Sequence, residues 1–125
     1  MSKQINFIYA ADENYNKQLL ISISSLLEQF SGIAKIHIIH KNPSSFIQKL
    51  QEIDSSDKLD QLNIYEFKES KVLFPNIEGT HISEATYYRL FVDRYIPNNI
   101  TEYVYLDADI ICLSDPYDYL KSNID

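Results

Sequence analysis

The chain has 125 residues, which suits one compact domain covering residues 1–125. Hydrophobic residues make up 45% of the chain and two residues are glycine, which excludes a low-complexity or linker-rich sequence. The formal net charge of −7 excludes a long basic track for nucleic acid, because neutralising phosphates requires clustered Lys and Arg.

The cysteine content and the length of the apolar runs indicate the cellular compartment in which the protein is expected. The single cysteine, Cys112, cannot form an internal disulfide, which favours a reducing compartment, and its apolar neighbours predict a small buried side chain. The sequence shows no targeting segment and no run of roughly 20 apolar residues. We therefore expect a cytoplasmic protein, and the sequence is compatible with peripheral contact with a membrane.

The first third of the chain predicts a strand followed by a helix. Residues 5–11 are an apolar run typical of a buried strand, and residues 12–14 are a polar turn that can cap a helix. Ser31 and Gly32 end this helix. Its buried face repeats at helical spacing and comprises Leu19, Leu20, Ile23, Leu26, Leu27 and Phe30. The polar side chains off that face are Lys17, Gln18, Ser22, Ser25, Glu28 and Gln29.

The middle of the chain predicts a second strand, a second helix and a third strand. Residues 35–40 form the second strand, and Asn42 and Pro43 open the helix, because proline is accepted in a first turn. Residues 54–60 predict a loop and residues 62–67 the third strand. The buried face of the second helix comprises Phe46, Ile47, Leu50 and Ile53.

The last part of the chain predicts one more helix and one more strand. Residues 68–80 predict an irregular connection, and Ser83 can cap a third helix that ends before Pro97. Residues 103–106 predict a fourth strand that is apolar on both faces. This alternation of strands and helices predicts an α/β fold, with a mainly parallel sheet and helices on both faces.

The first candidate site is Asp107-Ala108-Asp109, between the fourth strand and the apolar residues 110–113. Ligands of open α/β sheets gather beyond the carboxyl ends of strands. If the backbone stays extended, its period of two turns both carboxylates to the same side. Two carboxylates that close repel each other unless a cation lies between them, and hard oxygen ligands favour Mg²⁺ or Mn²⁺.

The alternative for this D-x-D triplet is a solvated capping turn. Because the chain contains ten Asp, about one such triplet arises by chance. Two acids between apolar runs are harder to reconcile with a solvated turn, since burying them without a partner is costly. Their placement therefore favours a metal or ligand role.

The second candidate site is the turn after the first strand, where small residues would let a ligand approach the backbone. Asp12 could accept a hydrogen bond from a base, and Asn14 and Tyr15 could bond to or stack on a nucleoside. The turn has no G-x-G-x-x-G, so the dinucleotide fingerprint is absent. The alternative, which the spacing alone favours, is an ordinary helix cap.

The third candidate is Arg89, which lies in a mostly apolar part of the third helix and could pair with phosphate or carboxylate. The alternative is a salt bridge to Asp93 or Glu84. The histidines show no metal-ligand spacing. His37 and His40 face opposite sides of one strand and are interpreted as structural, and His81 is a weak candidate.

Three segments together resemble glycosyltransferase family 8, the retaining sugar transferases of the GT-A fold. The family includes bacterial lipopolysaccharide galactosyl- and glucosyltransferases and glycogenin-like enzymes. The matching segments, in the family's order, are residues 7–15, residues 81–90 and residues 103–110. Three separated motifs are more specific than any one, and the resemblance runs along essentially the whole chain.

The resemblance implies a Rossmann-like GT-A nucleotide-sugar-binding fold and a metal-dependent hexose transfer from a UDP-sugar to a glycan or lipopolysaccharide acceptor. Asp107 and Asp109 would ligate Mn²⁺ or Mg²⁺, and Arg89 would hold the diphosphate or the sugar. The backbone of Ala108 would lie near the ribose. The uridine pocket would be lined by Ala10, Ala11, Asp12, Asn14 and Tyr15.

The chain departs from the family pattern after the D-x-D segment. The family carries further strands and a late His that completes the metal site, and no such sequence follows Asp125. We therefore expect a truncated, N-terminal nucleotide-sugar-binding part of the family 8 domain. A sheet that stops at its fourth strand exposes an edge that invites self-association.

Two other functions remain open from the sequence. A non-catalytic nucleotide-binding or oligomerising module would share these motifs without turnover. A D-x-D phosphotransferase would use its first Asp as a nucleophile, but those sites follow the first strand and carry Thr or Val four residues on. Here Asp107 is late in the chain and Ile111 occupies that position.

Overall fold

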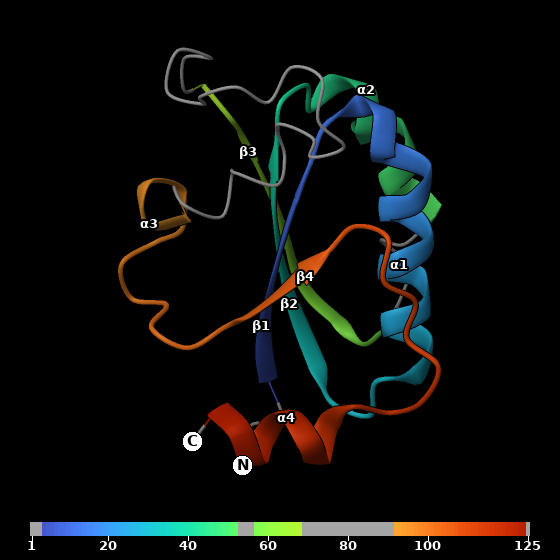
Figure 1. The fold of residues 1–125 in the computed structure, drawn as a ribbon, viewed down its shortest axis with the longest axis vertical. Helices are drawn as coiled ribbons and strands as arrows, with labels where there is room; N and C mark the ends of the chain where they lie inside the picture. Colours follow the sequence, from blue (N-terminus) through green and yellow to red (C-terminus); the bar gives the residue numbers. More distant parts are fainter. Residues whose placement is uncertain (1–3, 53–56, 69–91, 125) are drawn as a thin grey trace, which may run out of the picture.

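The computed structural model describes residues 4–52, 57–68 and 92–124. Its strands form one four-stranded sheet in the order β3-β2-β1-β4, and every neighbouring pair is parallel. The parallel α/β sheet predicted from the sequence is therefore confirmed (Figure 1). The strands are β1 (Gln4–Ala11), β2 (Ile33–His40), β3 (Leu59–Glu66) and β4 (Val104–Asp107).

Helices lie on both faces of this sheet, as predicted (Figure 1). One face is covered by α1 (Asn16–Gln29), with α2 (Ser44–Ile47) close to it, and the other face by α3 (Val92–Tyr95). A further helix, α4 (Tyr117–Ile124), lies at the end of the sheet where β1 begins. Within the described residues, no helix is long and apolar enough to cross a membrane.

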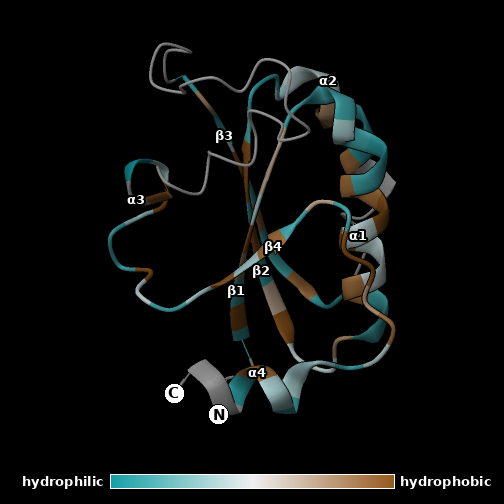
Figure 2. Ribbon diagram, viewed as in Figure 1, coloured by the Kyte–Doolittle hydropathy of each residue, from teal (hydrophilic) through white to brown (hydrophobic). Residues whose placement is uncertain are grey.

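The alternation of side chains along each strand divides the interior into two cores. Phe7 and Tyr9 of β1 pack towards α1, whereas Ile8 and Ala10 pack towards Val92 of α3. Figure 2 shows apolar residues along the strands and on the side of α1 that faces the sheet. Both faces of β1 are therefore buried, which explains why its sequence is a continuous apolar run.

The buried residues of α1 include the predicted Leu19, Ile23, Leu26 and Leu27, whereas the predicted Leu20 is only half-buried and the polar Asn16 and Ser22 are buried as well. Ser22 was expected off the apolar face, but it is only 2% exposed. Its Oγ lies 2.9 Å from the Tyr9 hydroxyl oxygen, in a buried hydrogen bond. A polar group is tolerated in a core when it has such a partner. Ser22 can therefore lie on the buried face of α1, although its polarity alone predicts the solvent side.

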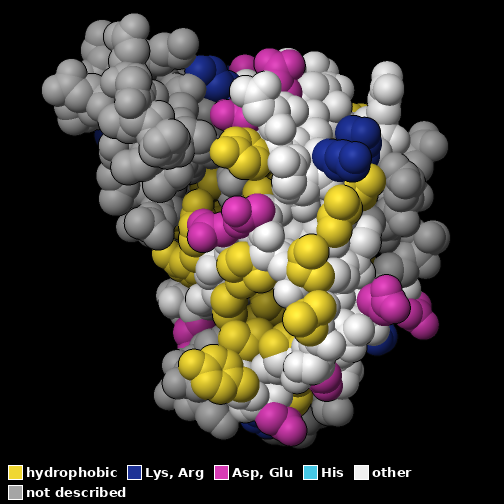
Figure 3. All heavy atoms as spheres, turned by 45° about the vertical axis from the view of Figure 1, so that its right-hand side comes forward, with side chains coloured by type: hydrophobic (Ala, Val, Ile, Leu, Met, Phe, Trp, Pro, Cys, Tyr) yellow, Lys and Arg dark blue, Asp and Glu magenta, His cyan; other side chains and the backbone are white. Residues whose placement is uncertain are grey.

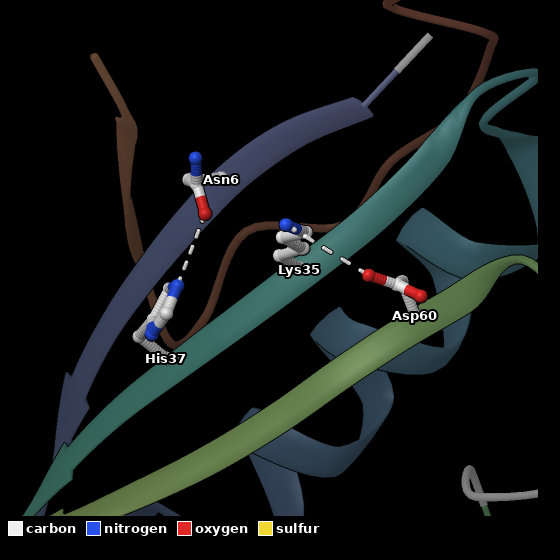
Figure 4. A network of polar contacts seen from close by, with 4 residues as sticks. All are labelled: Asn6, Lys35, His37 and Asp60. Atoms are coloured by element: carbon white, nitrogen blue, oxygen red, sulfur yellow. Dashed lines mark hydrogen bonds and ion pairs between the residues drawn. The ribbon is translucent and has the colours of Figure 1, made fainter. Parts of the chain in front are cut away.

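The third strand begins earlier than predicted. Residues 54–60 were expected to be a loop, but β3 starts at Leu59, which pairs with Ala34 of β2. The Lys58 carbonyl accepts a hydrogen bond from the Ala34 amide at 2.7 Å, and Lys35 Nζ lies 3.9 Å from a carboxylate oxygen of Asp60 (Figure 4). Backbone pairing and one ion pair therefore extend the strand into a polar segment that carries no hydrophobic signal.

The second helix is shorter than predicted. It consists of one turn of α2 followed by a 3-10 helix, η2 (Gln48–Glu52). Phe46 is buried as expected, but the prediction for Ile47 was wrong, because its side chain is 52% exposed. A single α-turn brings Phe46 onto the core and leaves Ile47 on the outer side. The predicted fourth member of this face, Ile53, lies outside the described residues.

The fourth strand is less buried than predicted. Val104, Tyr105 and Leu106 are half-buried rather than buried on both faces. In the part of the chain that the structure describes, β4 pairs with β1 on one side only. An edge strand keeps part of its surface open to solvent, which accounts for the difference.

The segment after β4 runs alongside α1 (Figure 1). The Cys112 amide donates a hydrogen bond to Ser25 Oγ at 2.9 Å, whereas the flanking Ile111 and Leu113 are 57% and 84% exposed. Figure 3 shows hydrophobic side chains gathered on this side of the molecule. Cys112 is half-buried rather than buried as predicted, and this burial raises the pKa of its thiol.

Candidate functional site

The carboxyl ends of three strands meet at one edge of the sheet. The strand register pairs Ala10 of β1 with Asp107 of β4, and Ala11 of β1 with His40 of β2. The turns that follow these strands therefore start side by side (Figure 1). Two of the predicted site segments, residues 12–15 and residues 107–109, begin at this edge.

The strand order gives this edge a particular geometry. β1 lies between β2 and β4, so the chain leaves β1 towards one neighbour and later returns to its other side. Such a reversal is a topological switch point, and open α/β sheets bind ligands in the crevice beyond the strand ends at that point. Residues 12–15 and residues 107–109 follow the two strands that flank it.

The turn after β1 is held by its own hydrogen bonds. Asp12 Oδ1 accepts a hydrogen bond from the Asn14 amide at 2.9 Å, and the Asp12 carbonyl accepts one from the Tyr15 amide at 3.0 Å. Asp12 thus caps the 3-10 helix η1 (Glu13–Tyr15), which confirms the predicted capping role. Asn14 is exposed and Tyr15 half-buried, so both side chains remain accessible at this edge.

The three alanines of the predicted site are buried. Ala10, Ala11 and Ala108 are 6%, 0% and 8% exposed. Ala11 and Ala108 pack in the core under α1, and Ala10 packs in the core under α3. A ligand at this edge would therefore meet the backbone of these residues rather than their methyl groups.

The backbone of the D-x-D segment differs from the extended conformation expected from the sequence. Asp107 ends β4, and Ala108 and Asp109 form a turn in which the Ile110 amide donates to the Asp107 carbonyl at 3.2 Å. The condition for the argument from strand periodicity is therefore not met, because side chains do not alternate through a turn. Both carboxylates are exposed, as in the solvated turn that was the alternative from the sequence.

The chemistry of these two carboxylates fits a hard divalent cation. Within the described residues, neither Asp107 nor Asp109 has a hydrogen-bonding or ion-pairing partner for its side chain. Exposed carboxylate oxygens without a partner are the ligands that Mg²⁺ and Mn²⁺ accept. The described part of the chain contains no cluster of three His, Cys, Asp or Glu side chains that could hold a metal ion.

The third predicted segment lies largely outside the described residues. Arg89, His81 and Glu84 belong to residues 69–91, and only the last turn of the predicted third helix is described, as α3. The role of Arg89 and its alternative ion pairs with Asp93 or Glu84 therefore stay predictions.

A hydrogen-bonded network that the sequence did not reveal lies directly beside the turn after β1. The Asn42 amide donates to His40 Nδ1 at 2.9 Å, and His40 Nε2 lies 2.7 Å from Asn16 Oδ1. Asn16 Nδ2 donates to Ser45 Oγ at 2.9 Å, and Ser45 Oγ donates to the Asn42 carbonyl at 2.7 Å. The network joins the end of β2 to the first residues of α1 and α2.

The network fixes the protonation state of His40. Because Nδ1 accepts a hydrogen bond from a backbone amide, the ring proton lies on Nε2, which donates to Asn16. Burial lowers the pKa of His40 and keeps the ring neutral, although the nearby carboxylates of Asp12 and Glu13 act in the opposite direction. The pattern that could have indicated this network is a His ending one strand and an Asn opening the adjacent helix, since parallel strand ends meet.

The other buried histidine faces the opposite side of β2, as predicted. His37 Nε2 lies 3.1 Å from Asn6 Oδ1 (Figure 4). The ring of His37 also stacks on that of Tyr65. His37 is 1% exposed and His40 is fully buried, so both belong to the interior. Only His40, of these two, contacts the edge of the sheet where the candidate segments lie.

Comparison with known proteins identifies the family. The profile described as glycosyl transferase family 8 matches residues 6–125. The chain belongs to glycosyl transferase family 8. Among curated family relatives, the lipopolysaccharide 1,2-glucosyltransferase of Escherichia coli (strain K12) is 26% identical over 117 residues. That match covers 91% of this chain and 34% of the relative, so the chain spans about a third of the relative's length.

Solved structures support the same fold for this family 8 chain. The galactosyltransferase LgtC, in complex with donor and acceptor sugar analogs, superposes with a TM-score of 0.72 at 20% identity, covering 92% of this chain and 41% of LgtC. The apo bifunctional glycosyltransferase WbbM superposes with a TM-score of 0.66 at 15% identity, covering 94% of this chain and 21% of WbbM. The sheet and its helices therefore correspond to the GT-A type of fold predicted from the sequence.

Proposed function

We propose that the protein transfers a hexose, glucose or galactose, from a UDP-sugar to a glycan or lipopolysaccharide acceptor. Family membership supports a sugar transferase, and the matched Escherichia coli relative is a lipopolysaccharide glucosyltransferase. The observation that carries the proposal is structural. Residues 12–15 and Asp107–Asp109 flank the topological switch point of a parallel sheet, where such sheets bind nucleotides.

The residues at this edge would bind and orient the donor. Asn14 and Tyr15 would contact the uridine, and the second carboxylate oxygen of Asp12 would accept a hydrogen bond from the base. Asp107 and Asp109 would hold Mn²⁺ or Mg²⁺ against the diphosphate, with Arg89 on the diphosphate or the sugar. A bound divalent cation supplies Lewis-acid stabilisation of the charge on the departing diphosphate.

The acceptor and the stereochemistry belong to the same proposal. We propose retention of the anomeric configuration, which rests on the resemblance to the retaining transferases. The product anomer, read by NMR from a reaction with UDP-glucose or UDP-galactose, tests this directly. A product of inverted configuration would contradict it.

Titration calorimetry of UDP with and without Mn²⁺ tests the donor site. We expect binding that depends on Mn²⁺ and weakens at least tenfold in Asp109→Ala, because a carboxylate ligand of the cation is lost. Asp57→Ala is the matched control, since Asp57 is an exposed acid that precedes β3, at the other end of the strands. Binding that is equally strong without metal and in Asp109→Ala would contradict the site assignment.

Enzymatic turnover of a UDP-sugar distinguishes a transferase from a non-catalytic module. A non-catalytic nucleotide-binding or oligomerising module would bind UDP but would not transfer or hydrolyse the sugar of a UDP-sugar. Light scattering combined with a hydrolysis assay distinguishes the two. Membership of family 8 favours the transferase over the D-x-D phosphotransferase, which trapping of a phosphorylated Asp107 would revive.

A further inference from the structure

Among the residues that the structure describes, Asn16, which directly follows the turn after β1, makes the side-chain hydrogen bonds that link this region to other elements. The internal bonds of the turn, from Asp12 to the Asn14 and Tyr15 amides, are local, and Tyr15 packs against the core under α1. Asn16 directly follows this turn as the first residue of α1 and is only 9% exposed. Its side chain reaches His40 on one side and Ser45 on the other.

The direction of every hydrogen bond in this network is determined. His40 Nδ1 accepts from a backbone amide, so Nε2 must donate and Asn16 must present its Oδ1 to His40. Asn16 Nδ2 then points at Ser45, where it meets both Oγ at 2.9 Å and the carbonyl at 3.3 Å. The side-chain amide of Asn16 therefore has one orientation that satisfies its hydrogen bonds. If the amide were flipped, Asn16 Nδ2 would face the Nε2–H of His40, donor against donor, and buried groups would lose their partners.

We propose that His40 and Asn16 are positioning residues, which hold the turn after β1 at the angle that the nucleoside half of the donor requires. The inference rests on the proposed function, because it assumes that Asn14 and Tyr15 contact the nucleoside. In this proposal His40 does not contact the UDP-sugar. It acts through Asn16, whose backbone continues directly from Tyr15.

Two substitutions at His40 separate the two hydrogen bonds of its ring. His40→Gln can place an amide donor near the position of Nε2 and keep the bond to Asn16, while it loses the acceptor for the Asn42 amide. His40→Asn can place an acceptor near the position of Nδ1 and keep the Asn42 bond, while it loses the bond to Asn16. If positioning passes through Asn16, His40→Gln is the variant that retains function.

Calorimetry with three probes measures the effect on each half of the site. We expect His40→Asn to bind UDP and uridine about tenfold more weakly than the unmodified protein, since an unsatisfied Asn16 releases the turn. Mn²⁺-pyrophosphate binding should stay unchanged, because that probe lacks the nucleoside. His40→Gln should stay within about threefold of the unmodified protein for all three probes, as should the control His37→Gln, which alters the other buried histidine.

Amide hydrogen exchange gives a second readout that needs no ligand. His40→Asn should raise exchange at the Asn14 and Tyr15 amides selectively, and His40→Gln should not. Ser45→Ala, which removes one acceptor of Asn16, should give the same pattern with a smaller amplitude and serves if His40→Asn does not fold.

The outcomes separate the two proposals. Equal effects of His40→Asn and His40→Gln, or an equal loss of UDP and Mn²⁺-pyrophosphate binding, would overturn the positioning role while leaving the donor site intact. Failure of the unmodified protein to bind UDP in Mn²⁺ would overturn the proposed function and the donor-positioning role with it. In that case the exchange data would still decide whether His40 orders the turn.

Discussion

The two turns that flank the switch point differ in how they are packed against the rest of the protein. The turn after β1 follows the fully buried Ala11, its Tyr15 packs against the core under α1, and the polar network around His40 lies beside it. The turn after β4 follows a half-buried edge strand, and its two carboxylates are exposed. Under the proposed function, the nucleoside would meet the more rigid side and a cation would meet the exposed carboxylates of the other.

The largest expected difference between the two sides is in core packing. Phe7→Ala should lower the free energy of unfolding by about 3–5 kcal/mol, because Phe7 is fully buried and meets Phe30 edge to face at 5.4 Å. Leu106→Ala on half-buried β4 should cost about 1 kcal/mol. Chemical denaturation measures both values. Similar losses would show that β4 is packed as tightly as β1.

The buried Tyr9–Ser22 hydrogen bond gives the next largest effect. Tyr9→Phe should cost about 1–2 kcal/mol, because it leaves the Ser22 hydroxyl buried without a partner, and Tyr9→Phe combined with Ser22→Ala should recover part of that loss. A double-mutant cycle in denaturant checks this expectation. Strictly additive losses would mean that the two groups do not interact in solution.

The same tyrosine predicts a limit to alkaline stability. Burial raises the pKa of Tyr9 from 10.0 to about 12, so the folded protein keeps its proton where the unfolded chain has lost it. The contribution of protonated Tyr9 to the free energy of unfolding is fully present below pH 10. It is lost as the pH rises towards 12, and the loss is about 1 kcal/mol at pH 11. Denaturation between pH 9 and pH 11.5 measures this loss, which Tyr9→Phe should reduce.

The two buried histidines predict a loss of stability on the acid side. Burial lowers the pKa of both His37 and His40, so the unfolded chain binds protons more readily than the folded protein as the pH falls below about 6.5. Their contribution to stability is therefore present above that pH and is lost as the pH falls through the lowered pKa values. Thermal unfolding from pH 7.5 to pH 5 should show the decline, and His37→Gln should weaken it.

The smallest expected effect on stability lies beside β4. Leu113→Lys should change the free energy of unfolding by less than about 0.5 kcal/mol, because Leu113 is 84% exposed. The substitution should nevertheless reduce self-association, if the apolar surface and the edge of β4 pair with another copy. Light scattering at increasing concentration measures this. A monomer without the substitution would contradict the predicted self-association.

The fold was largely predictable because strands buried on both faces carry a continuous hydrophobic signal. The residues of β1 and β2, and the apolar face of α1, follow directly from that signal. The sequence-based predictions were wrong where hydrogen bonds, rather than hydrophobic side chains, determine burial or strand length. Ser22 is buried through its bond to Tyr9, and β3 extends to Leu59 through backbone pairing with β2.

The sequence indicated both candidate segments but not how they come together. The sequence indicated Asp12, Asn14, Asp107 and Asp109, but it could not indicate that β4 lies beside β1, which is what brings the two turns together. It also could not indicate the bond between His40 and Asn16, because the two residues lie 24 positions apart and meet only when β1, β2 and α1 assemble.

Binding of UDP in the presence and absence of Mn²⁺, with Asp109→Ala compared with Asp57→Ala, tests the central claim most directly. We predict Mn²⁺-dependent binding that Asp109→Ala weakens at least tenfold, with an unchanged free energy of unfolding, while Asp57→Ala binds as the unmodified protein does. Binding that ignores both the metal and Asp109 would contradict the assignment of a metal-assisted donor site to this edge of the sheet.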